Sequence, residues 1–305
     1  MQVDPELEPV LKLIGDFLPL WEMPLEQARM YRPEFDAAMG RKREEMQSVE
    51  DVTISGREGN GILLRVYNPQ DAGRDPGTVV FYHGGGFVTG SVETYDSLCS
   101  MIASASGCRV VSVGYRLAPE HKFPAAPYDA LDSFRWVYEN MHSSAFAVMG
   151  DSAGGNLAAV VAQEAKRAGQ KIALQVLIYP LLTLDWKLPS AIENADAPTL
   201  SEKEMSWYLS HYLSDQAEGR SLLASPLLLG DLSDVPPALI ITAELDPLRD
   251  HGEMYASALR KSGVSVAGMR FTGMVHGFFG MSFSRSAKSA LAVVASNLKS
   301  SLRGD

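Results

Sequence analysis

From Gly77 onward, short and continuously apolar segments alternate with longer stretches of helical character. The first such segment, Val79–Tyr82, is what we expect of a strand covered by helices on both faces of a sheet. Strands are predicted at 79–82, 109–115, 146–149, 172–179, 238–243 and 264–271, and helices at 93–106, 126–142, 153–168, 250–262 and 284–302. The alternation predicts an α/β fold with a mostly parallel sheet.

A different pattern precedes this alternation. Val49–Ser55 and Ile62–Tyr67 alternate apolar and polar residues in period two, and Gly59-Asn60-Gly61 lies between them. Two such segments joined by an Asn-Gly turn predict an antiparallel hairpin. We therefore expect the sheet to begin with an antiparallel pair and to continue in parallel.

Two segments have no place in the predicted sheet. Residues 1–47 keep helical spacing of apolar side chains and end in a charged helical stretch at 41–45. Residues 183–224 lack a clear strand and carry four aromatic residues, Trp186, Trp207, Tyr208 and Tyr212. We expect residues 48–182 and 225–305 to form the core, and these two segments to form a helical cap over it.

Composition excludes several classes of protein. The chain has 305 residues, of which 46% are hydrophobic, so it can bury a sizeable core. Its two cysteines, Cys99 and Cys108, favour a reducing compartment over a disulfide framework. The net charge of −10 disfavours nucleic-acid binding, which needs a basic surface. Because we find no long apolar run, signal peptide or metal-ligand spacing, we expect a cytoplasmic protein without stable membrane association, metal or cofactor.

The segment Gly150-Asp-Ser-Ala-Gly154 fits the pattern G-x-S-x-G, which alone is a weak signal. Here it follows the predicted strand 146–149 and opens a predicted helix, the context that a nucleophile elbow requires. The flanking glycines and Ala153 allow a tight turn, and the helix N-terminus favours negative charge developing at Ser152. We therefore interpret Ser152 as a nucleophile rather than as a simple helix cap.

Three glycines, Gly84, Gly85 and Gly86, follow His83 at the end of the strand 79–82. Such a row exposes backbone amides, which suit an oxyanion hole completed by the amide of Ala153. A glycine triplet alone would indicate only a flexible loop, but beside a nucleophile elbow it predicts an oxyanion hole. His83 is expected to anchor the loop through its ring rather than to act as a base.

The acid that orients the base of such a triad should follow the next-to-last strand. Asp246 lies in the loop after the strand 238–243 and precedes Pro247, so we expect its carboxylate to point across the strand ends. Glu244 is the alternative acid. Asp250 is expected to cap the following helix.

The base should follow the last strand, and His276 occupies that position, next to Gly277. The other histidines fit this role less well. His121 and His142 flank a predicted helix, His211 lies in the predicted cap, and His251 lies at a helix start. We therefore expect His276 to be the base, although a lone loop histidine is often only a surface residue.

Together these motifs resemble those of the bacterial hormone-sensitive-lipase-like carboxylesterases, also called family IV esterases. The resemblance spans about residues 79–280 and rests on His83-Gly-Gly-Gly-Phe87, Tyr115-Arg-Leu-Ala-Pro-Glu120, Phe123-Pro-Ala-Ala126, Gly150-Asp-Ser-Ala-Gly-Gly-Asn156, Asp246-Pro-Leu-Arg-Asp250 and His276-Gly-Phe278. It implies an α/β-hydrolase fold with a cap, a catalytic Ser152, Asp246 and His276, and oxyanion amides from Gly84, Gly85, Gly86 and Ala153.

The activity that the resemblance implies is hydrolysis of small-molecule esters with short to medium acyl chains through an acyl-enzyme intermediate. Members of the family often dimerise through the strand at the sheet edge, so a homodimer is expected. The same triad also serves amidases, arylformamidases, deacetylases and C–C hydrolases, which remain alternatives. A non-enzymatic receptor, like the similar plant gibberellin receptors, is a further alternative, but such receptors typically lack the base that His276 provides here.

Overall fold

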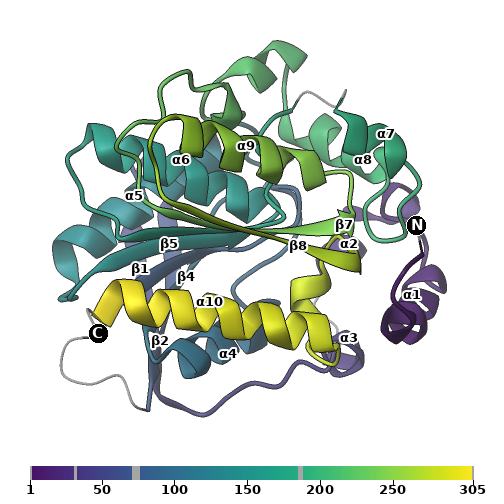
Figure 1. Cartoon of the computed structure of the whole chain (residues 1–305), viewed down its shortest axis with the longest axis horizontal. Coiled ribbons are helices and arrows are strands. Elements are labelled where there is room, and N and C mark those ends of the chain that lie inside the picture. The colour runs from purple at the N-terminus through teal and green to yellow at the C-terminus, as the bar shows by residue number, and fades with distance from the viewer. Residues whose placement is uncertain (1, 31–32, 71–75, 185–187, 304–305) are drawn as a thin grey trace.

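A single eight-stranded sheet runs through the computed structural model, which describes residues 2–30, 33–70, 76–184 and 188–303 (Figure 1). Its strands, in the order β1-β2-β4-β3-β5-β6-β7-β8, are β1 (Met46–Ser55), β2 (Gly61–Pro69), β4 (Arg109–Gly114), β3 (Thr78–Tyr82), β5 (Phe146–Asp151), β6 (Leu174–Ile178), β7 (Ala238–Leu245) and β8 (Val266–Val275). β2 pairs antiparallel with β1 and with β4, and all other pairs are parallel. The predicted mostly parallel sheet with an antiparallel start is confirmed.

Helices cover both faces of this sheet (Figure 1). One face carries α5 (Ala125–Asn140), α6 (Ala153–Arg167) and α9 (Arg249–Lys261), and the other carries α4 (Asp96–Ser106) and α10 (Arg285–Arg303). Successive strand residues point to the two faces, so Val80 belongs to one buried cluster and Val79 to the other. Burying an aliphatic side chain of this size stabilises the fold by roughly 1.5–3 kcal/mol, which explains why the central strands are continuously apolar.

The remaining long elements gather at the end of the sheet to which the parallel strands point (Figure 1). They are η1 (Pro5–Leu7), α1 (Glu8–Gly15), η2 (Leu20–Glu22), α2 (Leu25–Arg29), α3 (Pro33–Ala38), α7 (Pro189–Glu193) and α8 (Glu202–Tyr212). Three 3-10 turns complete the described part of the chain, namely η3 (Gln216–Arg220), η4 (Pro226–Leu228) and η5 (Phe278–Gly280). Of the aromatic residues of the predicted cap, Trp186 lies outside the described residues.

Two local predictions are wrong. The charged stretch 41–45 is not helical, because Gly40 turns the chain with φ of 65° and β1 begins at Met46. Asp250 does not cap α9, which begins one residue earlier; its carboxylate instead accepts a hydrogen bond from the Ser190 amide at 2.8 Å. As for membrane spans, the helices of the described ranges are all too short or too polar to cross a bilayer.

Candidate active site

Ser152 occupies a strained turn between β5 and α6. Its backbone has φ of 54° and ψ of −118°, a conformation that non-glycine residues rarely adopt and that is typical of functional sites. The Ser152 amide is held by the carbonyl of Ile178 at 2.9 Å. A Cβ atom at Gly154 would lie 1.9 Å from the carbonyl oxygen of Tyr82, so the second glycine of the motif is required by this close approach.

The structure brings together the three side chains predicted to form a triad. His276, in the loop after β8, has its Nε2 atom 2.9 Å from Ser152 Oγ and its Nδ1 atom 2.8 Å from Asp246 Oδ2. Asp246 is fully buried, and its other oxygen accepts a hydrogen bond from the Leu248 amide at 2.8 Å. Because a carboxylate can only accept, the proton of the neutral ring lies on Nδ1, and Nε2 can accept from the serine hydroxyl.

The surroundings of His276 distinguish Asp246 from the alternative acid. Glu244 turns elsewhere, since its Oε2 atom accepts a hydrogen bond from the Gly273 amide at 2.8 Å. The imidazole ring lies against the ring of Tyr179, with 4.7 Å between centroids, and the His276 carbonyl accepts from the Thr199 hydroxyl at 2.8 Å. The ring is thus held on several sides, and Thr199 comes from the inserted segment.

The loop after β3 directs two backbone amides to one side. The Gly84 carbonyl accepts from His83 Nδ1 at 2.7 Å, and the Gly85 carbonyl accepts from the Val88 and Thr89 amides at 2.9 and 2.8 Å. In a trans peptide the N–H points opposite to the C=O, so the Gly85 and Gly86 amides point away from these contacts. Within the described residues, neither amide has a hydrogen-bond partner. Ala153, the first residue of α6, has no intrahelical partner for its amide.

The amide of Gly84 is engaged differently from those of the next two glycines. It donates to Asp151 Oδ1 at 2.9 Å and to the Tyr95 hydroxyl at 3.1 Å. This amide is therefore not available to a substrate oxygen in the structure. We accordingly correct the expectation for Gly84 and retain Gly85, Gly86 and Ala153 as candidate oxyanion donors.

Asp151 is the site residue that our reading of the sequence missed. Its carboxylate is buried next to the nucleophile, and burial raises its pKa to about 6 against the opposing effects of Tyr95, His276 and the Gly84 amide. A usable signal was present, because Asp151 ends an otherwise apolar strand immediately before Ser152. His83, as expected, anchors the loop, and burial lowers its pKa to about 4, so its ring is neutral.

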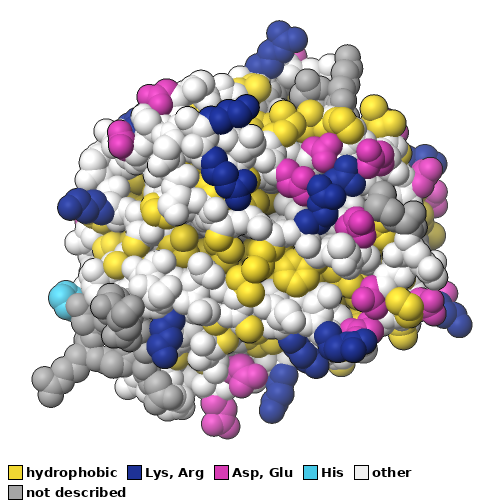
Figure 2. All heavy atoms as spheres, in the orientation of Figure 1, with side chains coloured by type: hydrophobic (Ala, Val, Ile, Leu, Met, Phe, Trp, Pro, Cys, Tyr) yellow, Lys and Arg dark blue, Asp and Glu magenta, His cyan; other side chains and the backbone are white. Residues whose placement is uncertain are grey.

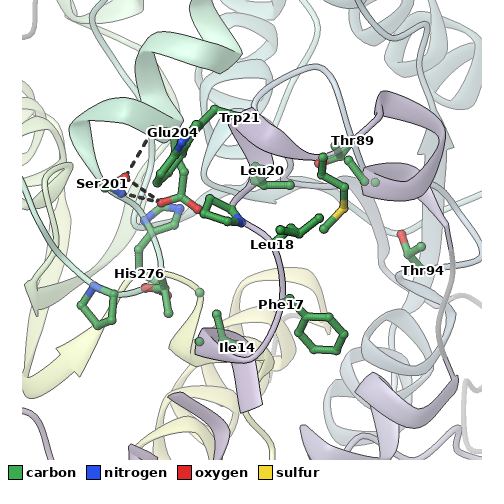
Figure 3. Close-up of a pocket in the computed structure, with 18 of the residues that line it drawn as sticks. Ile14, Phe17, Leu18, Leu20, Trp21, Thr89, Thr94, Ser201, Glu204 and His276 are labelled. Atoms are coloured by element: carbon green, nitrogen blue, oxygen red, sulfur yellow. Dashed lines mark hydrogen bonds between the residues drawn. The ribbon is translucent and has the colours of Figure 1, made fainter. Parts of the chain in front are cut away.

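A cavity of about 720 Å³ lies beside His276 (Figure 3). Residues from α1, η2 and α2, including Ile14, Leu20 and Trp21, face Ser201 and Glu204 of the inserted segment across it. Thr89 and Tyr95 of the core also line it, and Phe17, Leu18 and Met30 line it with side chains that are 38%, 58% and 61% exposed. Ser152 itself is not among the lining residues, so the cavity reaches the triad from the side of His276.

The described residues contain no group of three or more His, Cys, Asp or Glu side chains that could hold a metal ion. The chemistry that the observed arrangement supports is that of a hydroxyl nucleophile, a neutral imidazole and backbone amides.

Comparisons with known proteins agree with this geometry. A protein family described by the alpha/beta hydrolase fold matches residues 79–280. The chain is 34% identical to an ethyl acetate hydrolase of Pseudomonas putida, with 99% of this chain and 100% of that protein covered. It is 38% identical to the carboxylesterase NlhH of Mycobacterium tuberculosis, with 90% and 89% covered.

Among solved structures, a hyperthermophilic esterase from the archaeon Pyrobaculum calidifontis superposes with a TM-score of 0.90 at 42% identity. The alignment covers 98% of this chain and 99% of that one. The similarity thus extends beyond the motifs to nearly the whole chain, including both segments outside the sheet. The chain therefore belongs to the α/β-hydrolase family that its motifs resemble.

Proposed function

We propose that this chain is a serine carboxylesterase in which Ser152 is the nucleophile, His276 the general base and Asp246 the residue that orients the base. The observation that carries the proposal is the continuous hydrogen-bond chain from Asp246 Oδ2 through both ring nitrogens of His276 to Ser152 Oγ, at 2.8 and 2.9 Å. The enzyme class is supported by full-length relatives named as hydrolases of carboxylic esters.

In the acylation step, His276 Nε2 takes the proton of the Ser152 hydroxyl as the oxygen attacks the ester carbonyl carbon. Asp246 stabilises the imidazolium that forms and fixes the ring orientation. The amides of Gly85, Gly86 and Ala153 stabilise the negative charge on the carbonyl oxygen of the tetrahedral intermediate. His276 then protonates the alcohol as the C–O bond breaks, which leaves the acyl group on Ser152.

In the deacylation step, a water molecule attacks the acyl-enzyme while His276 again accepts a proton. The carboxylic acid leaves as Ser152 recovers its hydrogen from His276, so the enzyme returns to its starting state. Every proton transfer passes through Nε2, which agrees with the assignment of the ring proton to Nδ1.

The substrates we propose are esters with short to medium acyl chains. Support comes from the cavity of about 720 Å³, whose walls include apolar side chains of 1–47 and residues of 183–224. In this proposal the two segments form a cap over the core, and the apolar cavity limits the length of chain that fits.

Assembly and location belong to the same proposal. Hydrophobic side chains lie along the band between α9 and α10, over β8 (Figure 2). β8 is the last strand of the sheet, and Met269 on it is 44% exposed, so its unpaired edge suits a homodimer. We further propose a cytoplasmic enzyme without a nucleic-acid partner, consistent with its net charge of −10.

The proposal is tested by labelling the chain with a fluorophosphonate that reacts only with an activated serine. We expect one label per chain on Ser152 and none in Ser152→Ala. Turnover of a nitrophenyl ester is then compared with that of the matching anilide. Faster anilide turnover would favour the amidase alternative, and an unlabelled wild-type protein would exclude a serine hydrolase.

A further inference from the structure

Three groups close a hydrogen-bonded ring directly behind the candidate oxyanion loop. Gly84 N donates to Asp151 Oδ1 at 2.9 Å and to Tyr95 Oη at 3.1 Å, while Tyr95 Oη donates to Asp151 Oδ2 at 3.0 Å. The ring links three distant parts of the chain, namely the β3 loop, the residue before α4 and the residue before Ser152.

The ring leaves little freedom to the peptide that precedes the candidate donors. A Cβ atom at Gly84 would lie 2.6 Å from Asp151 Oδ2 and 2.9 Å from Tyr95 Oη, so the backbone lies directly on the pair. On the other side of this peptide, the His83 carbonyl accepts from the Tyr115 hydroxyl at 2.7 Å. Both polar atoms of the His83–Gly84 peptide are thus held, and the orientation of the next two amides depends on it.

We propose that Asp151 and Tyr95 are positioning residues that hold the Gly84 amide so that the Gly85 and Gly86 amides meet the developing oxyanion. This inference rests on the proposed function, because it assigns a task within the same reaction. Neither side chain has to touch the substrate carbonyl. Tyr95 also lines the cavity, which connects the ring to the space where the substrate lies.

The geometry requires an ionised Asp151. The carboxylate receives two donors, one from each neighbour, and a protonated carboxyl would have to turn its own O–H against one of them. The groups whose charges act on Asp151, or on which its charge acts, are Tyr95, His276, Arg41, Tyr179, Tyr115 and Cys99. Of these only Arg41 is always a cation, and it is held by Asp36 at 3.1 Å and by the Gly280 carbonyl at 2.8 Å.

The test compares Tyr95→Phe, Asp151→Asn and Asp151→Ala with wild type. A matched control is Tyr67→Phe, since the Tyr67 hydroxyl donates to the Asp96 carboxylate at 2.9 Å outside the site. Hydrolysis of 4-nitrophenyl butanoate gives kcat and KM per active serine, counted by fluorophosphonate titration. Inhibition by phenylboronic acid, which forms a tetrahedral adduct with an active-site serine, reports on the oxyanion hole.

We expect kcat to fall about 10-fold in Tyr95→Phe and Asp151→Asn and about 100-fold in Asp151→Ala, the lower range for loss of one oxyanion donor. KM should stay within about threefold, and phenylboronic acid should bind more weakly in the same proportion as kcat/KM falls. Tyr67→Phe should behave as wild type. Should Asp151→Ala fail to fold, the two conservative variants still decide.

Two results would overturn the inference: variants with kcat within twofold of wild type, or a change confined to KM. Either could occur while Ser152→Ala is inactive and wild type is labelled, in which case the proposed function stands without this inference. If wild type neither hydrolyses esters nor reacts with the fluorophosphonate, the proposed function itself fails.

Discussion

The aromatic ring of Tyr208, on α8, lies directly against the backbone of Gly86, so that a Cβ atom at Gly86 would come within 2.2 Å of the ring. The Tyr208 hydroxyl also hydrogen-bonds the Thr89 side chain, and Thr89 in turn donates to the Gly85 carbonyl at 3.2 Å. The next aromatic residue of α8 behaves similarly, since Tyr212 stacks on Phe87 with 4.0 Å between centroids. The inserted segment therefore buttresses the loop that carries the candidate oxyanion donors.

This contact predicts that Gly86→Ala lowers kcat/KM by about 100-fold or more, since a displaced loop loses an oxyanion donor. Gly86 has φ of 59° and no space for a Cβ atom. A matched control is Gly169→Ala, because Gly169 has φ of 69° but no neighbouring atom within 4 Å of the place where a Cβ atom would lie. That control should cost about 1 kcal/mol of stability and leave kcat/KM unchanged. Equal activities for the two variants would show that the loop tolerates displacement.

The triad predicts large losses from single substitutions. Ser152→Ala and His276→Ala should each lower kcat by roughly 10³–10⁶-fold without unfolding the protein, and Asp246→Asn should fall in the same broad range because it favours the wrong tautomer of the base. Glu244→Gln is the control, since Glu244 only holds the Gly273 amide. An inactive Glu244→Gln beside a nearly normal Asp246→Asn would reverse the assignment of the acid.

Asp151 predicts an opposite effect on stability. Its pKa is raised from 3.8 to about 6 in the folded protein, so the folded state binds a proton more tightly than the unfolded state does. This carboxyl therefore lowers the stability of wild type as the pH rises from about 4 to 6, whereas Asp151→Asn lacks the titration. Relative to wild type, the variant should gain about 2 kcal/mol of unfolding free energy between about pH 4.5 and 7.5.

Urea unfolding at the two pH values measures this difference. The matched control is Asp132→Asn, because Asp132 is also a buried carboxylate, but it is paired with Arg57 at 2.8 Å. A stability difference for Asp151→Asn that does not change with pH would show that the Asp151 carboxyl is not held in its costly ionised form.

Most of the fold was predictable because its signals are local. A continuously apolar strand such as Val79–Tyr82 and a turn such as Gly150–Gly154 identify themselves within a few residues, and strand order then places Ser152, Asp246 and His276 at one end of the sheet. The side chains of these three residues lie within hydrogen-bonding distance of one another for that reason.

What the sequence did not reveal depends on contacts between distant segments. Asp151 and Tyr95 are 56 residues apart, and nothing near Tyr95 in the sequence indicates that its hydroxyl meets Gly84. The stretch 41–45 was mistaken for a helix because its charged residues favour helices locally, whereas in the fold Arg41 reaches across to the Gly280 carbonyl. Tertiary contacts outweigh propensity at such positions.

The exposed edge of β8 predicts that the chain forms a homodimer in solution. Because a lysine on an edge strand opposes pairing, Met269→Lys should shift the mass measured by light scattering towards that of one chain. Ile192→Lys is the matched control, since Ile192 is 72% exposed on α7 and away from β8. A wild-type protein with the mass of a single chain at micromolar concentration would refute the dimer.

The cavity beside His276 predicts an optimum in acyl chain length. Each methylene group that enters an apolar pocket contributes up to about 0.8 kcal/mol, or about fourfold in kcat/KM, so activity should rise with chain length at first. Once the chain reaches the wall formed by residues of α1, η2 and α8, further methylenes cause overpacking and the trend should reverse. We expect nitrophenyl esters from butanoyl to octanoyl to be the best substrates, with weak activity beyond dodecanoyl.

The measurement is kcat/KM for the series from acetyl to hexadecanoyl in wild type and in Trp21→Ala. Trp21 lines the cavity and contacts the Lys203 ammonium, which lies 5.5 Å from its ring centroid, so the variant enlarges the cavity where the two capping segments meet. Its optimum should move to longer chains. Lys12→Ala, on α1 but not among the lining residues, should leave the profile unchanged. A wild-type maximum at hexadecanoyl, or activation at an oil–water interface, would contradict a cavity of limited depth and favour a lipase.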